Sequence, residues 1–265
     1  MNQATRVAFV ITCTLTGGLL AGCGAGTSSN QASPPVAATP SGGNGSAFSR
    51  VIRDAMSHVP TQHEPPLMAP TILPQDKISQ FGVSNARASA LTAPNPWYAV
   101  QLLSGISPLA SFGATVDANP NDAALAVQTN SEKLGPLKPV GTGVAKLGGH
   151  LTAIVTHYQV SATSSKAASM SWTTSRWRIT VTNYAGGTVP MAVAQEVMAD
   201  LKGQSLPVPQ SQGALFVNLG GSAGVRVDMQ WQHGSDEYFV DTYNTATDPI
   251  MAAIQMTASM EPYPS

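Results

Sequence analysis

The chain has 265 residues, of which 43% are apolar and only 10% are charged, and its formal net charge is −1. This apolar content is enough for a packed core. Because the net charge is close to zero and no basic run occurs, we expect neither nucleic acid as a partner nor a polybasic membrane patch.

Residues 1–22 have the pattern of an export leader. Arg6 is the one charge, an apolar run extends from Val7 to Leu20, and small residues follow. The run is shorter than the roughly 20 residues that a membrane-spanning helix needs. We therefore expect the leader to be cleaved rather than kept as a span.

The sequence Leu20-Ala21-Gly22-Cys23 resembles the lipobox of bacterial lipoproteins. The resemblance implies that a lipid is attached to the Cys23 thiol and that the leader is removed in front of it. Because Cys13 leaves with the leader, the mature chain has no free thiol and no disulfide. The alternative is an ordinary secretory leader with a chance cysteine.

Residues 23–45 follow as a tether. Between Gly24 and Gly45 no charged or aromatic residue occurs, and Gly, Ser, Ala, Pro, Thr, Asn and Gln dominate. Such a composition cannot bury enough apolar area to offset the entropy of ordering. We expect a flexible segment between the lipid and the folded part.

The next segment, residues 46–147, is the less regular part of the mature chain. Apolar residues at helical spacing predict a helix between Ser46 and Pro60, and the five prolines of residues 60–75 predict an extended stretch. Further on, Trp97 to Leu103 has the composition of a buried strand, and residues 117–122 that of a turn. The rest of residues 75–147 gives no clear pattern.

Residues 148–265 give clearer patterns. Helices are predicted after Pro190, with Gly203 as the stop, and after Asp248, which is placed to cap a helix with Pro249 at its first position. Strands are predicted at residues 151–160, 171–183, 214–218 and 225–232.

A Gly234-Ser235 turn suits a two-residue β-hairpin, because glycine takes a positive φ at the first central position of a type II′ turn. This turn places Trp231 opposite Tyr238 and Asp228 opposite Asp241, on the two different faces of the hairpin. The register therefore predicts an apolar face and a polar face.

These patterns indicate an α+β fold: an antiparallel sheet with amphipathic helices packed on one face. Strands followed by a helix occur twice, which also suggests an internal duplication of a strand-strand-helix unit. The tryptophan strand, the tight turn, the aromatic strand and the closing helix ending "IQMTASM" resemble modules of unknown function on extracytoplasmic bacterial proteins. This resemblance implies no catalytic residues.

Two patterns could support catalysis. Gly220-Gly221-Ser222-Ala223-Gly224 matches the G-x-S-x-G elbow of serine hydrolases, but that elbow needs a helix after the serine and here a strand is predicted. Asp228 and Asp241, facing each other, could share a proton or a cation, whereas Arg226 on the same face could simply relieve their repulsion. A hydrolase using Ser222 or this aspartate pair is the alternative function.

We expect no cofactor and no metal site, because proline and strand spacing keep the histidines apart. Trp97 and Tyr98 are the candidates for an exposed aromatic pair that stacks on wall glycans, with core packing as the alternative. The predicted function is non-catalytic: a lipoprotein on the extracytoplasmic face of the cell membrane, or on the outer membrane where one exists. Its partners would be a wall polymer or another envelope protein.

Overall fold

The computed structural model describes residues 48–60, 65–79, 81–129, 137–160, 166–221 and 224–264. The leader, the tether and Cys23 lie outside the described residues. The folded part belongs to one compact unit, Gly45–Ser265.

Runs of strands separated by single helices make up this unit. The helices among the described residues are α1 (Arg50–Met56), α2 (Pro120–Thr129), α3 (Met191–Leu201) and α4 (Pro249–Ala258). The strands are β1 (Met68–Pro70), β2 (Asn85–Leu91), β3 (Trp97–Ser104), β4 (Ser107–Val116), β5 (Leu137–Gly148), β6 (Leu151–Val160), β7 (Lys166–Thr174), β8 (Trp177–Asn183), β9 (Gly213–Gly221), β10 (Gly224–His233), β11 (Asp236–Tyr243) and β12 (Met260–Pro262).

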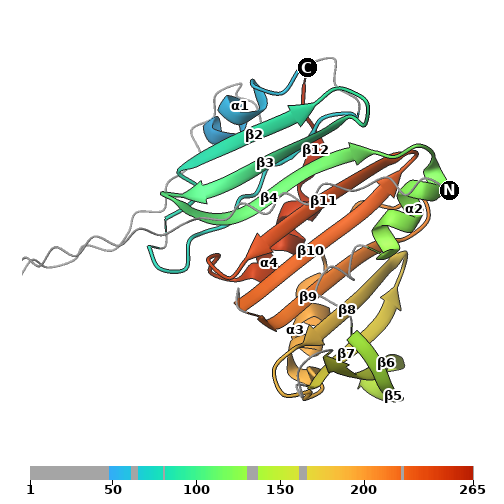
Figure 1. Ribbon diagram of the computed structural model, residues 1–265. Helices are drawn as coiled ribbons and strands as arrows, with labels where there is room; N and C mark the ends of the chain where they lie inside the picture. The colour runs from blue at the N-terminus through green and yellow to red at the C-terminus, as the bar shows by residue number, and fades with distance from the viewer. Residues whose placement is uncertain are drawn as a thin grey trace, which may run out of the picture. The chain divides into compact units, whose positions relative to one another are not determined.

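One large sheet organises the fold (Figure 1). Its ten strands follow the order β2-β3-β4-β11-β10-β9-β8-β7-β6-β5. Neighbouring strands are antiparallel except β8 and β9, which are parallel and are connected through α3. A parallel pair needs such a crossover, usually a helix. The predicted α+β class is confirmed, with a mixed rather than a wholly antiparallel sheet.

The sheet joins the two segments that the sequence separates at residue 147. Strand β4 of the first segment pairs with β11 of the second, with Phe112 opposite Val240 and Ser111 opposite Asp241. Strands β5 and β6 meet at the boundary itself and form a hairpin. Residues 46–147 and 148–265 are therefore parts of one unit.

The β10–β11 hairpin has the predicted register. Trp231 lies opposite Tyr238, and Asp228 lies opposite Asp241. Gly234 has a φ of 63°, as the first central residue of a type II′ turn requires. The two-residue turn therefore sets which side chains of this hairpin point to each face.

One face of the sheet is the core face. Trp231 is 4% exposed, its ring centroid lies 5.5 Å from that of Tyr238, and the Trp177 centroid lies 6.4 Å away. Buried residues on the same face, or packed on it, are Tyr98, Val100, Phe112, Met170, Trp172, Ile179, Val181, Leu215, Val217, Val227, Met229, Val240, Ile250 and Ile254.

Helix α4, near the C-terminal end of the sequence, packs on this face of the sheet. Asp248 caps it as predicted, accepting a hydrogen bond from the Met251 N–H at 2.9 Å, with Pro249 in the first turn. On the buried side, the Thr257 hydroxyl donates to Met229 Sδ at 3.2 Å. Helix α1 is also capped, because Ser49 Oγ accepts from the Ile52 N–H.

Two predictions are wrong in the region of helix α2: the turn at residues 117–122 and the packing of helices on one face only. The sequence predicts a turn at residues 117–122, but Asn119 Oδ1 accepts hydrogen bonds from the Asn121 and Asp122 N–H groups and so starts a helix. Val127 of α2 clusters with Ala214 and Phe216, whereas Leu215 between them belongs to the core face. Because successive strand residues point to opposite faces, α2 packs on the face opposite α4. The prediction of helices on one face only is wrong for α2.

The strand predicted at residues 171–183 is two strands. Strands β7 and β8 pair with Thr174 opposite Trp177, and Ser175 in the turn has a φ of 51°. The Arg176 guanidinium in the same turn donates hydrogen bonds to the carbonyl oxygens of Pro209 and Gln210. The turn is therefore held from outside by a segment more than thirty residues away in sequence.

The described part of the proline-rich stretch from residue 65 onward forms no helix and supplies β1. Met68 lies opposite Pro262 of β12, and the Tyr263 N–H donates to the Leu67 carbonyl at 2.8 Å. Among the described helices, none has both the length and the apolar character that crossing a bilayer demands.

We predict that Trp231→Ala lowers the free energy of unfolding by about 3 to 5 kcal/mol, because it leaves a large cavity between Tyr238 and Trp177. Chemical denaturation of both proteins measures this difference. The matched control is Arg87→Ala on an exposed position of β2, which we expect to change stability by less than about 0.5 kcal/mol. Equal stability of the wild-type and Trp231→Ala proteins would contradict the assignment of Trp231 to the core.

Candidate functional site

The face opposite the core carries a cluster of polar side chains on neighbouring strands. We call it the Arg226 cluster: Arg226 and Asp228 on β10, Asp241 and Tyr243 on β11, Asn218 on β9 and Ser111 on β4. Strand alternation places all six on this face, and the register aligns Asn218, Arg226 and Tyr243 in one row and Asp228, Asp241 and Ser111 in the next.

Arg226 lies between the two aspartates. Its Nε is 2.7 Å from Asp228 Oδ1, and one terminal nitrogen is 3.3 Å from Asp241 Oδ2. The Arg226 side chain is 44% exposed, whereas those of Asp228 and Asp241 are 14% and 15% exposed. Arg226 therefore bridges the carboxylates and still faces solvent.

The electrostatics of Arg226 follow from this position. Burial lowers the pKa of Arg226, but the carboxylates of Asp228 and Asp241 outweigh that effect and raise it above the ordinary value. The guanidinium is therefore always charged. The arrangement matches the alternative in which Arg226 relieves the repulsion of the pair, rather than a pair that shares a proton.

Neutral groups complete the cluster. Asn218 Nδ2 donates to Asp228 Oδ2 at 3.3 Å, and the Ser111 hydroxyl lies 3.5 Å from Asp241 Oδ2 and 3.2 Å from the Tyr243 hydroxyl. The Arg226 guanidinium also lies 5.9 Å from the centroid of the Tyr243 ring. These contacts fix donors, acceptors and an aromatic ring relative to one another.

Tyrosine hydroxyls around the cluster stay protonated. Burial, followed by the charge of Asp241, raises the pKa of Tyr243. Burial also raises the pKa of Tyr184 to about 12, with smaller contributions from Tyr158 and Asp228. These phenols act as hydrogen-bond donors and acceptors at neutral pH rather than as bases.

Ser222 lies outside the described residues. The strands on either side of it, β9 and β10, pair antiparallel, with Gly221 opposite Gly224. A strand therefore follows the glycine-rich sequence, where a nucleophile elbow requires a helix.

Trp97 and Tyr98 do not form an exposed pair. Tyr98 is completely buried on the core face, where its hydroxyl accepts from the Met68 N–H at 2.8 Å and donates to the Met68 carbonyl at 3.0 Å. Trp97, one residue earlier, points to the opposite face and is half-buried. The predicted glycan-stacking role is wrong for Tyr98 because a strand cannot expose two consecutive side chains on one face.

The described histidines lie on different elements. His58 follows α1, and its Nδ1 lies 2.8 Å from the Asp54 carbonyl oxygen. His150 lies in the β5–β6 turn and His157 on β6, whereas His63 and Glu64 lie outside the described residues.

Three carboxylates gather where α3 meets the start of α4. The ligand-type oxygens of Glu196, Asp200 and Asp248 lie within 4.8 Å of one another. Burial, followed by the charges of Asp248 and Glu196, raises the pKa of Asp200, and Asp200 Oδ2 is buried without a hydrogen-bond partner among the described residues. Exposed acidic groups often gather without binding a metal, and what these three carboxylates supply is charge repulsion.

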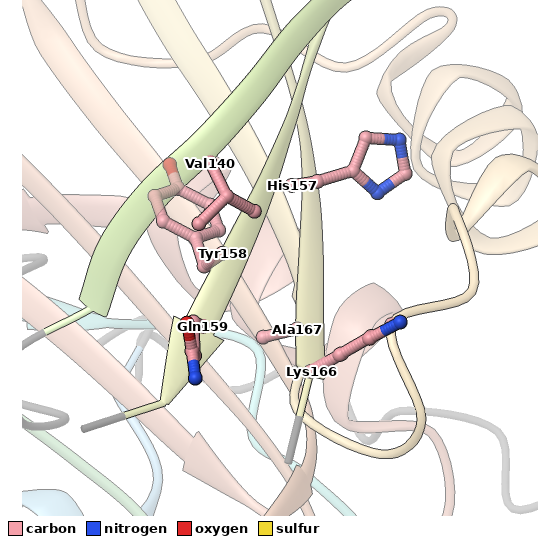
Figure 2. Close-up of a pocket in the computed structure, with 7 residues that line it drawn as sticks. Val140, His157, Tyr158, Gln159, Lys166 and Ala167 are labelled. Carbon is pink, nitrogen blue, oxygen red and sulfur yellow. The ribbon is translucent and has the colours of Figure 1, made fainter. Parts of the chain in front are cut away.

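A cavity of about 410 Å³ lies at the β5–β7 side of the sheet, lined by Val140, His157, Tyr158, Gln159, Lys166, Ala167 and Gly187. Figure 2 shows that His157 and Lys166 extend to one side of the strands and Tyr158 to the other. Its polar groups therefore do not converge on one point. The Arg226 cluster, in which charged and neutral polar atoms meet, is the better candidate for a site.

Sequence reasoning identified Asp228, Asp241 and Arg226 but missed the neutral members of the cluster. Tyr243 lies two residues after Asp241 on the same strand and therefore on the same face. The hairpin register, which places it opposite Arg226, could have identified it from the sequence. Ser111 lies on a strand without a clear sequence pattern, and Asn218 joins only through the pairing of β9 with β10.

Comparison with known proteins gives no match: neither a family model, nor a curated protein, nor a solved structure is significantly similar to this chain.

We predict that Asp200→Asn stabilises the protein at pH 7 by up to about 1 kcal/mol, because it removes the cost of burying the Asp200 charge and its repulsion by Asp248 and Glu196 in a water-screened cluster. The raised pKa of Asp200 means that the folded state holds its proton more tightly than the unfolded state. The wild-type protein therefore loses stability as the pH rises through the folded pKa. Melting temperatures at pH 7 and below the ordinary carboxyl pKa measure the effect, and the gain should vanish at the lower pH. A gain that persists there would contradict this electrostatic origin.

Proposed function

We propose that the chain is a lipid-anchored, extracytoplasmic binding protein that holds a hydroxyl-rich polymer of the cell envelope on the polar face of its sheet. The observation that carries this proposal is the position of Arg226, fixed between two carboxylates and exposed to solvent. The Arg226 cluster is the binding site in this proposal.

The anchor follows from the residues around Cys23. Each buried methylene of an acyl chain contributes roughly 0.8 kcal/mol to membrane affinity, so two or three chains hold a protein on a membrane almost permanently. A coil of the length and composition of residues 23–45 has an average reach of about 25 Å. The folded unit would therefore work close to the bilayer and within reach of the wall.

Binding fits the Arg226 cluster better than catalysis does. A general acid needs a carboxyl group whose environment favours the protonated form. Both carboxylates are instead engaged in ion pairs with the Arg226 guanidinium, a contact that suits a structural role rather than proton donation. The alternative hydrolase would depend on this pair or on Ser222, and the local geometry favours neither.

The chemistry of the cluster suits a ligand rich in hydroxyl groups. Carboxylate and amide oxygens accept hydrogen bonds from hydroxyls, the guanidinium and the amide nitrogen donate to them, and the Tyr243 ring offers an apolar face. These groups lie on the four adjacent strands β9, β10, β11 and β4. Polar groups spread across neighbouring strands suit an extended polymer such as a wall glycan.

We predict that Cys23→Ala releases the protein from membranes, because the acyl chains supply the attachment. Fractionation of cells expressing each form, followed by immunodetection, measures the distribution. Substitution of Ala21 by Gly keeps a small residue and serves as the matched control, which should stay in the membrane fraction. A Cys23→Ala protein that remains fully membrane-bound and cleaved would contradict the lipid anchor.

We predict that Arg226→Ala weakens binding to insoluble cell-wall glycan by about tenfold or more, because a charge-assisted hydrogen-bonding group is lost. Arg226→Lys keeps the charge between the aspartates but loses the fork geometry, and should also weaken binding. Co-sedimentation with purified wall glycan measures both.

Arg87→Ala is the matched control for these variants. Arg87 lies on the same face of the sheet, in register with Gln101, Ser111 and Asp241, but on the outer strand β2. We expect unchanged binding for this variant. Equal binding by wild type, Arg226→Lys and Arg87→Ala would exclude the Arg226 cluster as the glycan site.

A further inference from the structure

Three loops meet at one end of the large sheet. They are the loop before β2, described at residues 75–79 and 81–84, the β3–β4 turn at residues 104–107 and the β11–α4 connection at residues 244–248 (Figure 1). The Lys77 N–H donates to the Thr245 carbonyl, and the Gly105 N–H donates to Ser84 Oγ, each at 2.8 Å. The loops therefore form one continuous surface.

This surface carries the most exposed large apolar side chains of the described residues. Ile78 is 94% exposed and Ile106 is 91% exposed. Phe81, on the same loop as Ile78, is 73% exposed and is the one aromatic residue among the strongly exposed apolar side chains in the described part of the chain. We call Ile78, Phe81 and Ile106 the apolar tips.

The loop that carries two of the tips has a defined conformation. Asp76 is buried, and its Oδ1 accepts hydrogen bonds from the Ile78 N–H at 2.8 Å and the Ser79 N–H at 2.7 Å. The Asp76 N–H in turn donates to the Phe81 carbonyl at 2.8 Å. The hydrogen bond from Ser79 is the largest reason why the pKa of Asp76 is lowered, so this turn persists in mild acid. Ile78 is thus held outward.

We propose that the apolar tips insert into the interfacial region of the bilayer that carries the lipid anchor, so that this end of the sheet faces the membrane. The inference rests on the proposed lipid anchor and goes beyond it, because an anchor alone leaves the orientation of the folded unit open. Exposed apolar clusters mark interaction sites rather than ordinary surface.

A bilayer fits the apolar tips better than a protein partner does. Ile78 and Ile106 are more than nine-tenths exposed and project from their loops instead of lining a groove. A fluid interface can accept such projections without a complementary surface. Phe and Ile are residues that peripheral proteins bury at the headgroup and acyl boundary. The exposed Lys77 lies beside Ile78, where a cation meets anionic headgroups.

Chain length permits this arrangement. Residues 24–47 separate Cys23 from Phe48, the first described residue. A coil of this length reaches about 25 Å on average, and more when extended. A tether of this reach would let the folded unit turn, so that the apolar tips can face the same bilayer.

Single-cysteine labelling tests the proposal on the intact lipoprotein. An introduced cysteine would be the one free thiol of the mature chain, because Cys13 leaves with the leader and Cys23 is acylated. Ile106→Cys and Ile78→Cys place an environment-sensitive nitrobenzoxadiazole label at the tips. Val144→Cys, 74% exposed on the distant β5, is the matched control. The lipidated proteins are reconstituted in phosphatidylcholine vesicles containing one quarter phosphatidylglycerol.

We expect a blue shift of the label at residues 78 and 106, with quenching by lipids that carry a spin label near the headgroup. The label at residue 144 should keep its spectrum in buffer. Lys77→Glu should reduce the quenching about fivefold at low salt, as expected for a cation beside an anionic surface. Unchanged melting temperatures show that the labelled proteins are folded.

A label at residue 106 that behaves like the one at residue 144 would overturn the inference. A label that is shielded from water in native membranes but not in pure lipid vesicles would also overturn the inference, because it would indicate a protein partner. Mass spectrometry of the first residue reports the anchor separately. An acylated protein with unshifted labels rejects the apolar tips alone, and an unacylated one rejects the proposed function.

Discussion

The two-residue turn at Gly234 is the constraint on which both faces of the sheet depend. It fixes Trp231 opposite Tyr238 on the core face and Asp228 opposite Asp241 on the other. A shift of one residue would bring the aspartates under α4 and expose the tryptophan. Such a shift would bury two charges and lose several kcal/mol of apolar burial, so the turn geometry and the hydrophobic pattern select the same register.

Charge placement follows from that register and limits the chemistry. Two aspartates facing each other repel, and a protein can relieve this by protonation, a cation or a cationic side chain. Here Arg226 supplies the positive charge from within the same hairpin. A guanidinium bound in this way cannot leave without restoring the repulsion, so the site is pre-organised before a ligand arrives. Pre-organisation of this kind favours binding because less ordering is required on association.

Much of the fold could be predicted where short-range rules decide. The α4 cap, the hairpin register and the position of β6 follow from capping chemistry, turn chemistry and strand alternation. The wrong predictions concern features that depend on contacts between residues far apart in sequence. In the β7–β8 turn, Arg176 donates hydrogen bonds to the carbonyl oxygens of residues 209 and 210. Helix α2 packs against β9, which lies more than eighty residues later in the chain. The internal duplication, whose two units would end in α3 and α4, stays a prediction. Asn218 and Ser111 belong to the site through strand pairing alone, which no local pattern reports.

The Arg226 cluster lies on strands that lead away from the apolar tips, which links the two proposals geometrically. Ser111 lies five residues beyond Ile106 along β4, a rise of about 17 Å at 3.4 Å per residue. With the tips in the interface, a polymer bound at Arg226 would run above the headgroups, in the space between the bilayer and the wall. The apolar tips on the loops and the polar cluster on the strands would then give the folded unit a fixed orientation. The Arg226 cluster would bind the polymer and the apolar tips would bind the bilayer. Together they would hold a wall polymer at a set height above the membrane.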